Sequence, residues 1–223
     1  MRRDACTTCG KCAAACPSGA LQIIGRPMTV DAVMEEVMKD LPFFRVSKGG
    51  LTVTGGEPLA QPEFLAALLR ATHDAGLSTC VETSGYAPWE CFEPILNCTD
   101  YFLYDIKESD PERHQIYTGA GPERIWDNLG RLNASGAQII LRCPIIPGFN
   151  DRIDHFAQIG RLAQAHAHVL RVEVEPYHPL GISKARNIGM ICQMQPIPLP
   201  TDEDTGNWIA QIAKWTDKPV RRA

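Results

Sequence analysis

Short apolar runs alternate with helix-like segments over most of the chain. Each run is rich in β-branched residues and ends in polar residues or glycine, and the segments between the runs repeat apolar residues every three to four positions. The predicted strands are residues 51–54, 77–82, 101–105, 138–142 and 168–175. The predicted helices between them are residues 62–75, 89–97, 122–135 and 152–167. The alternation predicts an α/β fold.

The strand runs are continuously apolar, which is typical of a parallel sheet that helices cover. Right-handed crossovers would place the carboxyl ends of all strands at one edge. We therefore expect an incomplete, TIM-type parallel β/α barrel over residues 29–223, with polar strand ends gathered on one rim. Any single polar strand end is equally consistent with an ordinary loop, but their number favours a site. These ends are residues 55–58, 82–85, 105–107, 142 and 177–178.

The flanking segments have patterns of their own. Residues 29–41 predict an amphipathic helix, with Thr29 as its N-cap and Pro42 as its stop. Residues 202–215 predict a further helix that packs on the core. The basic end, residues 218–222, is expected to be a solvated tail.

Composition narrows the functional classes. Hydrophobic residues make up 44% of the 223 residues, charged residues 22%, and the net charge is −4, so we expect a globular protein that does not bind nucleic acid. No apolar run approaches the roughly 18 residues of a membrane span, and the first residues lead into cysteines instead of a signal core. The expected location is the cytoplasm, without membrane association.

The cysteines fall into two groups. There are nine, an odd number without a signal peptide, which favours free thiols or metal binding over a disulfide framework. Five are scattered without close spacing: Cys80, Cys91, Cys98, Cys143 and Cys192. The other four form a run that ends in Pro17: Cys6, Cys9, Cys12 and Cys16.

The run has the spacing Cys-x2-Cys-x2-Cys-x3-Cys-Pro of bacterial ferredoxins, which predicts a [4Fe–4S] cluster. Zinc is the weaker alternative, because zinc sites usually take two separated pairs of ligands. Residues 1–28 are therefore predicted to be a partial ferredoxin-like iron–sulfur segment. In two-cluster ferredoxins the fourth cysteine ligates the other cluster. Cys16 either closes the same cluster as its neighbours or, as we favour, had partners upstream of Met1.

The ordered motifs of the chain resemble one family. After the cysteine run come residues 53–59 (VTGGEPL), 81–86 (VETSGY), 104–107 (YDIK), 144–150 (PIIPGFN) and 175–181 (EPYHPLG). In this order they resemble the glycyl-radical enzyme activating enzymes of the radical S-adenosylmethionine superfamily, which include the pyruvate formate-lyase activating enzyme. The cysteine run resembles the branch of that family with a ferredoxin-like insert.

The resemblance implies a binding site for S-adenosylmethionine on the rim. Gly55 and Gly56 would let the backbone approach the methionine end closely, and Glu57 would supply a carboxylate or backbone acceptor near its ammonium group. Lys107 would pair with the cofactor carboxylate, while Asp105 balances local positive charge or a bound cation. A tight strand-to-helix turn is the structural alternative for the glycines.

Three further positions follow from the same resemblance. Arg142 would assist at the carboxylate, and His178 would approach the cofactor, although a lone histidine after a strand is more often a structural residue. Thr83, after Glu82, matches an acidic–threonine pair near a monovalent cation in the family, with glutamate as the acid here.

One family feature is missing from the sequence. Family members begin with a strand followed by a Cys-x3-Cys-x2-Cys loop, which leaves one iron of the catalytic cluster open for the cofactor. The sequence contains no such spacing, so it offers no ligands for that catalytic cluster. We therefore expect an N-terminally truncated member, through a start codon assigned too far downstream, a cloning boundary or a natural truncation.

The implied activity is the activation of a partner enzyme such as pyruvate formate-lyase. A reduced [4Fe–4S] cluster, supplied with electrons by a donor such as flavodoxin or ferredoxin, would cleave S-adenosylmethionine to methionine and a 5′-deoxyadenosyl radical, which takes the pro-S hydrogen from a glycine. The alternative is a non-catalytic iron–sulfur protein that carries electrons or binds a partner. A phosphate-binding α/β enzyme is disfavoured, because Glu57 would repel phosphate.

Overall fold

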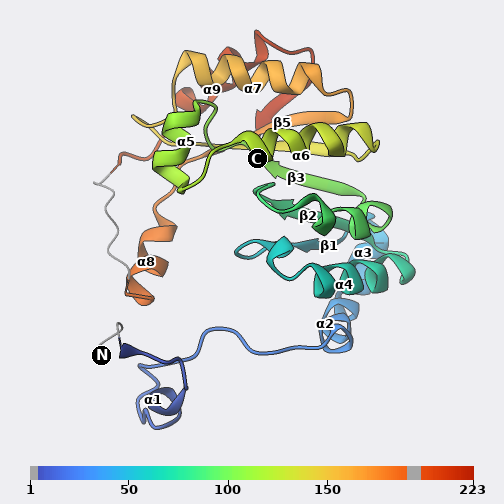
Figure 1. Ribbon diagram of the computed structural model, residues 1–223, viewed down its shortest axis with the longest axis vertical. Helices are drawn as coiled ribbons and strands as arrows, with labels where there is room; N and C mark the ends of the chain where they lie inside the picture. Colours follow the sequence, from blue (N-terminus) through green and yellow to red (C-terminus); the bar gives the residue numbers. More distant parts are fainter. Residues whose placement is uncertain (1–4, 190–196) are drawn as a thin grey trace.

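The computed structural model describes residues 5–189 and 197–223 (Figure 1). Its centre is one sheet of six strands, all parallel and arranged in chain order. The strands are β1 (Gly50–Val53), β2 (Ser78–Thr83), β3 (Tyr101–Asp105), β4 (Ile139–Ile145), β5 (Val169–Pro176) and β6 (Val220–Arg222). The sequential order agrees with the predicted incomplete barrel, because each strand lies beside the next one along the chain.

Helices connect the strands. Before β1 come α1 (Lys11–Ala14), α2 (Val30–Val37), the 3₁₀ turn η2 (Met38–Asp40) and α3 (Leu41–Ser47). The first two connections contain η3 (Pro58–Ala60), α4 (Pro62–Asp74), η4 (Trp89–Cys91) and η5 (Glu93–Cys98). The later ones contain α5 (Pro111–Thr118), α6 (Glu123–Ala134), α7 (Ile153–Ala165), α8 (Leu180–Asn187) and α9 (Asp202–Ala213). None of these described helices has the length and apolar character needed to cross a membrane.

The two faces of the sheet differ in character. One face is buried under the helices, and its core side chains include Val81, Phe102, Tyr104, Leu141 and Val172. On the other face the pairing register sets Asp105, Arg142, Glu173 and Arg221 side by side across four strands. A charged row on one face of a parallel sheet is unlike a core that is apolar on both sides. This second face is therefore suited to contact polar groups.

The predicted strands are confirmed, with small shifts at their ends. The prediction that the basic residues 218–222 form a solvated tail is wrong. Residues 220–222 form β6 against β5, and the amide of Val172 donates to the carbonyl of Pro219 at 2.9 Å. The expectation of a solvated end was wrong because the two arginines of β6 alternate around the sheet plane. Arg221 donates to Glu173 at 2.8 Å, and Arg222 donates to Asp202 at 2.6 Å.

Two predicted helices also differ from the structure. Residues 89–97 form the short turns η4 and η5, and Pro94 near the start of η5 has no amide to donate to a longer α-helix. Thr29 does cap α2, since its hydroxyl accepts from the amide of Ala32 at 3.2 Å. Pro42, however, lies in the first turn of α3 (Leu41–Ser47) instead of ending a helix, because a proline costs nothing in a first helical turn.

The N-terminal part lies apart from the barrel. In Figure 1 the segment that carries α1 is separated from the sheet and reaches α2 through an extended stretch. Residues 22–29 form neither helix nor strand, and none of residues 5–28 is buried. We call residues 5–28 the cysteine segment.

Candidate functional site

The loops after β1, β2 and β3 enclose a cavity of about 310 Å³, which we call the rim cavity. It lies at the carboxyl ends of neighbouring parallel strands, the position at which α/β folds build their sites. Six of the eight residues predicted to bind the cofactor line it: Gly55, Gly56, Glu57, Thr83, Asp105 and Lys107. Its other lining residues are Thr54, Glu82 and Ser84.

In the loop after β1, two glycines without side chains line the rim cavity. Gly55 has a φ of 148°, a conformation that residues with a side chain disfavour. A Cβ atom placed on Gly55 or Gly56 would meet no protein atom within 4 Å. The backbone at these two glycines therefore faces open space, and a ligand in the rim cavity can approach its amide groups directly.

Glu57 holds the rim cavity together. Its Oε1 accepts from the hydroxyl of Thr83 at 2.7 Å and from the amide of Leu59 at 3.2 Å. Its Oε2 accepts from the amide and hydroxyl of Ser84 at 2.9 and 2.7 Å. A carboxylate offers about four acceptor positions, and all are used here. Glu57 was predicted to offer the ammonium group either its carboxylate or its backbone carbonyl. Because the carboxylate already joins the loops after β1 and β2, only the backbone carbonyl is available for that role.

Asp105 and Lys107 form an ion pair at the cavity wall. The Lys107 Nζ lies 3.1 Å from an Asp105 carboxylate oxygen, and the two side chains are 44% and 17% exposed. Burial raises the pKa of Asp105, and the charge and hydrogen bond of Lys107 oppose that shift. Lys107 is the one cation among the described residues that line the rim cavity, and its exposure leaves it free to meet an anionic group.

Arg142 and His178 lie elsewhere. They line a neighbouring cavity of about 800 Å³, which shares Glu82 with the rim cavity. Arg142 forms ion pairs with Glu82, at 2.8 Å, and with Glu175, while its Nε is buried without a partner among the described residues. The structure therefore does not bring these two predicted residues together with the other six.

Sequence reasoning missed two of the residues that shape this site. Ser84 stood within the 81–86 motif, but its hydroxyl was not assigned the bond to Glu57 that it makes. Asn150 ends the 144–150 motif, is 3% exposed and donates to the carbonyl of Lys107 at 2.8 Å. The motif position was the available signal for both, whereas their bonding partners depend on the fold.

The cysteine segment presents thiols to solvent. Cys6, Cys9 and Cys12 are exposed, Cys16 is half-buried, and all four are free thiols. A hydrogen bond from Ser18 lowers the pKa of Cys16, and a hydrogen bond from the backbone of Lys11 lowers that of Cys9, which favours the thiolate form that binds metal. Within residues 5–189 and 197–223, no three His, Cys, Asp or Glu side chains are grouped as a ligand set. The predicted cluster stays a prediction, and Cys192 lies outside the described residues.

Comparison with known proteins decides the family. The family model described as "Radical SAM superfamily" matches residues 6–159 of this chain. The chain belongs to the radical SAM superfamily. Its match begins at the cysteine run and extends through β1–β4 into α7, so it contains the rim cavity.

Its relatives within the superfamily are glycyl-radical enzyme activating enzymes. The isethionate sulfite-lyase activating enzyme of Oleidesulfovibrio alaskensis is 43% identical over 187 residues, which are 82% of this chain and 59% of that protein. The pyruvate formate-lyase 2-activating enzyme of Escherichia coli K12 is 36% identical over 208 residues, 92% of this chain and 71% of that protein. The chain spans about three fifths of the length of the isethionate sulfite-lyase activating enzyme.

Solved structures agree on the fold. A domain of the pyruvate formate-lyase activating enzyme of Bacteroides vulgatus superposes with a TM-score of 0.65 at 23% identity, over 78% of this chain and 99% of that one. Streptococcus suis SuiB bound to S-adenosylmethionine superposes with a TM-score of 0.62 at 13% identity, over 91% of this chain and 45% of that one. The predicted incomplete barrel and the family resemblance are confirmed. Radical SAM activating enzymes use a [4Fe–4S] cluster and S-adenosylmethionine.

Proposed function

We propose that this chain binds S-adenosylmethionine in the rim cavity and serves in the activation of a glycyl-radical enzyme. The observation that carries the proposal is the meeting of bare glycine backbone, an exposed lysine and half-buried carboxylates at the ends of β1, β2 and β3. The activating enzymes to which the chain is similar support the reaction class.

The rim cavity fits the methionine end of this cofactor, which carries one carboxylate and one ammonium group. Lys107 offers an exposed cation for the carboxylate. Glu82 and Asp105 offer negative charge for the ammonium group, and the backbone at Gly55 and Gly56 is open to it. When bound, the cofactor would supply the radical chemistry by which enzymes of this family remove hydrogen from a glycine.

The residues of this chain contribute binding and orientation. Lys107 fixes the carboxylate end, and the glycine backbone sets how deeply the cofactor lies in the rim cavity. Glu57, through Thr83 and Ser84, keeps the loops after β1 and β2 at a constant separation. A preformed cavity of this kind lowers the entropic cost of placing a reactive group.

The catalytic cluster does not fit the residues present. The sequence has no Cys-x3-Cys-x2-Cys spacing, and no set of three ligating side chains lies at the rim among the described residues. We derive no step through that cluster. The run Cys6, Cys9, Cys12 and Cys16 has the donor chemistry for an iron–sulfur cluster of its own, which would relay electrons or help hold the partner.

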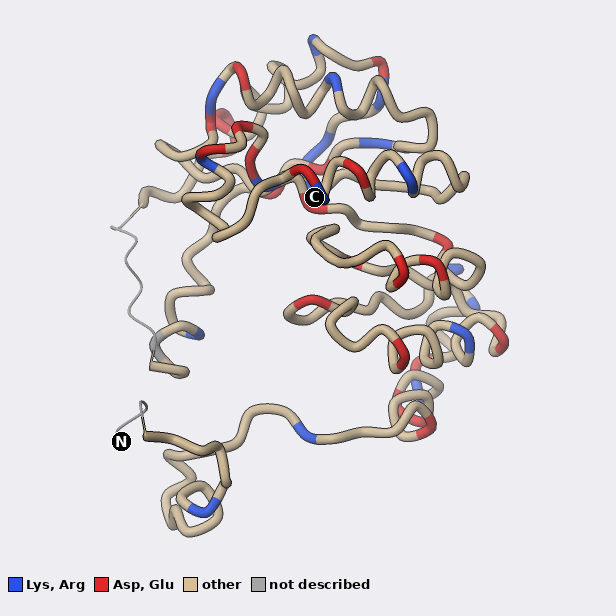
Figure 2. Tube along the Cα trace, viewed as in Figure 1, with Lys and Arg blue, Asp and Glu red and all other residues tan. Residues whose placement is uncertain are grey.

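The proposed partners follow from this assignment. The protein substrate is a glycyl-radical enzyme, and the electron donor is a flavodoxin or ferredoxin, in the cytoplasm and away from membranes. Nucleic acid is not among the proposed partners, and Figure 2 shows acidic and basic positions interspersed along residues 5–189 and 197–223.

One observation favours a second candidate, an iron–sulfur protein that carries electrons or binds a partner without radical chemistry. The described chain combines a ferredoxin-type cysteine run with the absence of ligands for a catalytic cluster. This candidate predicts a cluster in the cysteine segment and no affinity for S-adenosylmethionine.

Equilibrium dialysis with radiolabelled S-adenosylmethionine separates the two candidates. We expect the wild-type chain to bind one equivalent, and Lys107→Ala to bind at least about tenfold more weakly, the cost of losing a charge-assisted contact. Lys214→Ala is the control, because Lys214 is exposed at the C-cap of α9, where it donates to Gln211 at 2.8 Å, and it does not line the rim cavity. Absence of binding by the wild type, or equal binding by Lys107→Ala, would contradict the proposal.

A further inference from the structure

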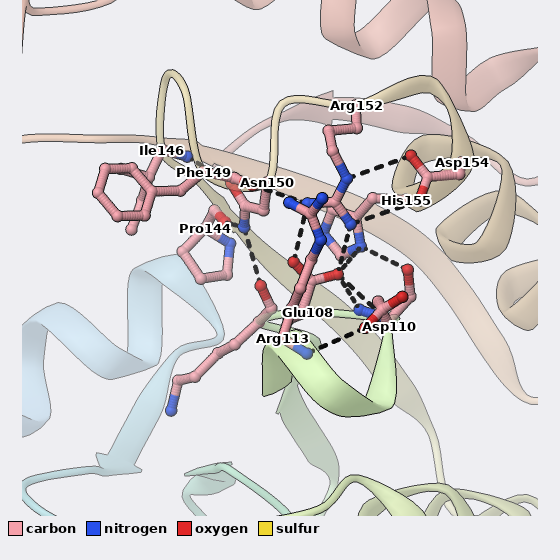
Figure 3. A network of polar contacts seen from close by, with 12 residues as sticks. Glu108, Asp110, Arg113, Pro144, Ile146, Phe149, Asn150, Arg152, Asp154 and His155 are labelled. Atoms are coloured by element: carbon pink, nitrogen blue, oxygen red, sulfur yellow. Dashed lines mark hydrogen bonds and ion pairs between the residues drawn. The ribbon is translucent and has the colours of Figure 1, made fainter. Parts of the chain in front are cut away.

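Two loops are tied together directly behind Lys107. Asn150, in the loop between β4 and α7, is 3% exposed. Its Nδ2 donates to the carbonyls of Lys107 and Pro144 at 2.8 and 2.7 Å, and its Oδ1 accepts from the amide of Ile146 at 2.7 Å. Figure 3 shows Asn150 beside Pro144 and Ile146 of its own loop, which its side-chain amide holds in a turn, and the same group fixes the backbone at Lys107.

The next residue is held from the same side. Glu108 is 2% exposed and accepts from both terminal nitrogens of Arg152, at 3.0 and 2.9 Å. It also accepts from the amides of Ser109 and Asp110 at 2.8 and 2.9 Å. Arg152 donates in addition to the carbonyl of Phe149 at 2.7 Å. The β3–α5 loop is therefore fixed at residues 107 and 108 by side chains of the β4–α7 loop, as Figure 3 shows.

Arg152 pairs with two carboxylates, the buried Glu108 and the exposed Asp154. Burial lowers the pKa of His155 to about 4, so its ring is neutral near pH 7 although it lies 3.7 Å from Glu108. Its Nδ1 instead meets the hydroxyl of Ser109 at 2.9 Å. Burial opposes ionisation of Glu108, but the hydrogen bonds from Arg152 and Asp110 outweigh it and lower that pKa. Glu108 and Arg152 thus form an ion pair in which the carboxylate is buried and the guanidinium is 21% exposed.

Buried ion pairs seldom add net stability, because desolvation offsets the attraction, but they can select one conformation. The conformation selected here is that of the segment that carries Lys107. The Nζ of Lys107 stands at the end of a long flexible side chain that is 44% exposed, and Asp105 is its one ion-pair partner among the described residues. The position of the Lys107 backbone therefore mainly determines which positions its Nζ can occupy.

We propose that Asn150 is a positioning residue for Lys107, supported by the pair of Glu108 and Arg152. By fixing the Lys107 carbonyl, Asn150 sets the direction in which the ammonium group enters the rim cavity. The identity of the anion that Lys107 meets rests on the proposed function, whereas the placement of Lys107 does not. The two parts are tested by separate measurements.

The first measurement is the NMR signal of ¹³C-dimethylated lysines, with the Lys107 signal assigned from a Lys107→Arg variant. We expect Asn150→Ala to move the Lys107 signal toward that of a solvated lysine. The matched control is Thr79→Val at the opposite end of β2, where a buried hydroxyl donates to the carbonyl of Cys98 at 2.9 Å and accepts from the amide of Asp100 at 3.1 Å. That variant loses comparable buried bonds and should leave the Lys107 signal unchanged.

The second measurement is dialysis with S-adenosylmethionine. We expect Asn150→Ala to weaken binding at least about fivefold, and Thr79→Val less than about twofold, since only the first acts on a charged contact. Should Asn150→Ala fail to fold, Arg152→Lys replaces it, because lysine keeps the charge but cannot form both bonds to Glu108. The shift expected for that variant is smaller but has the same direction.

A folded Asn150→Ala variant with the wild-type Lys107 signal would overturn the inference. A similar displacement of the signal in Thr79→Val would also overturn it, because general loosening would then explain the effect. If the wild type binds no S-adenosylmethionine while Asn150→Ala still moves the Lys107 signal, the proposed function fails and the positioning role stands.

Discussion

The rim cavity and the cysteine segment differ in how much of their geometry the polypeptide itself supplies. At the rim, Glu57 makes four hydrogen bonds and Asn150 makes three, and β2 and β3 beneath carry buried side chains at alternate positions. In the cysteine segment no residue is buried, and the thiols face solvent. A site of the first kind exists before its ligand arrives, whereas a site of the second kind needs its metal to become ordered.

The largest effect that tests this contrast is expected from the cysteine run. Cys9→Ser combined with Cys12→Ser should abolish the roughly four irons per chain that anaerobic reconstitution introduces. The melting temperature of the barrel should stay constant, because the cysteine segment buries no residue. Iron analysis measures the cluster content and calorimetry measures the melting temperature. The control is Cys91→Ser, at a half-buried cysteine outside the cysteine segment. A parallel fall in melting temperature would show that the two regions stabilise one another.

Removing the acceptor at the rim should give the next largest effect. Glu57→Ala leaves Thr83 and Ser84 without their shared acceptor, and we expect a loss of about 2–4 kcal/mol in the free energy of unfolding. Urea unfolding measures it. Glu90→Ala, at an exposed carboxylate in η4, should change the same quantity by less than about 0.5 kcal/mol. Equal effects of the two variants would mean that the rim is not preformed by Glu57.

The buried histidine behind Lys107 should make barrel stability depend on pH. The pKa of His155 is about 4 in the folded state, below its usual value near 6.5, so the unfolded state binds the proton first. Stability is therefore lost as pH falls below about 6.5, by about 2 kcal/mol between pH 6.5 and 5. His155→Asn should flatten that dependence in urea unfolding measured at several pH values. An unchanged slope would contradict the assignment of a neutral, buried ring.

The smallest stability effect should come from the residue to which we give the largest role in binding. Lys107→Ala removes a half-exposed ion pair, which is worth about 1 kcal/mol or less to folding. Urea unfolding should therefore detect little change, while S-adenosylmethionine binds at least about tenfold more weakly. A large loss of stability would indicate that Lys107 serves the fold more than the ligand.

The sequence predicts features that depend on neighbouring residues better than features that depend on contacts between residues distant in the chain. The predicted strands were found because buried parallel strands need apolar residues in succession, and Asp105 and Lys107 were found because β3 places them at its end. β6 was missed because its short, arginine-rich pattern resembles a solvated tail. Its pairing depends on Glu173, distant in sequence.

In the candidate site, too, the residues were predictable from local motifs, whereas their contacts were not. Its glycines, acids and lysine stood in recognisable motifs, so six of the predicted residues do meet in one cavity. The use of the Glu57 carboxylate within the protein could not be predicted, because Thr83 and Ser84 reach it across 26 and 27 positions of sequence. The bond from Asn150 to Lys107 spans 43 positions, and the separation of His178 from the rim cavity likewise depends on how the strands pack.

The most direct test of the central claim is an NMR titration of S-adenosylmethionine into the ¹³C-dimethylated chain. The account predicts saturable displacement of the Lys107 signal at one equivalent, with the signals of Lys11 and Lys214 unmoved. Saturable binding that leaves the Lys107 signal in place, or no binding at all, would contradict the assignment of the rim cavity as the cofactor site.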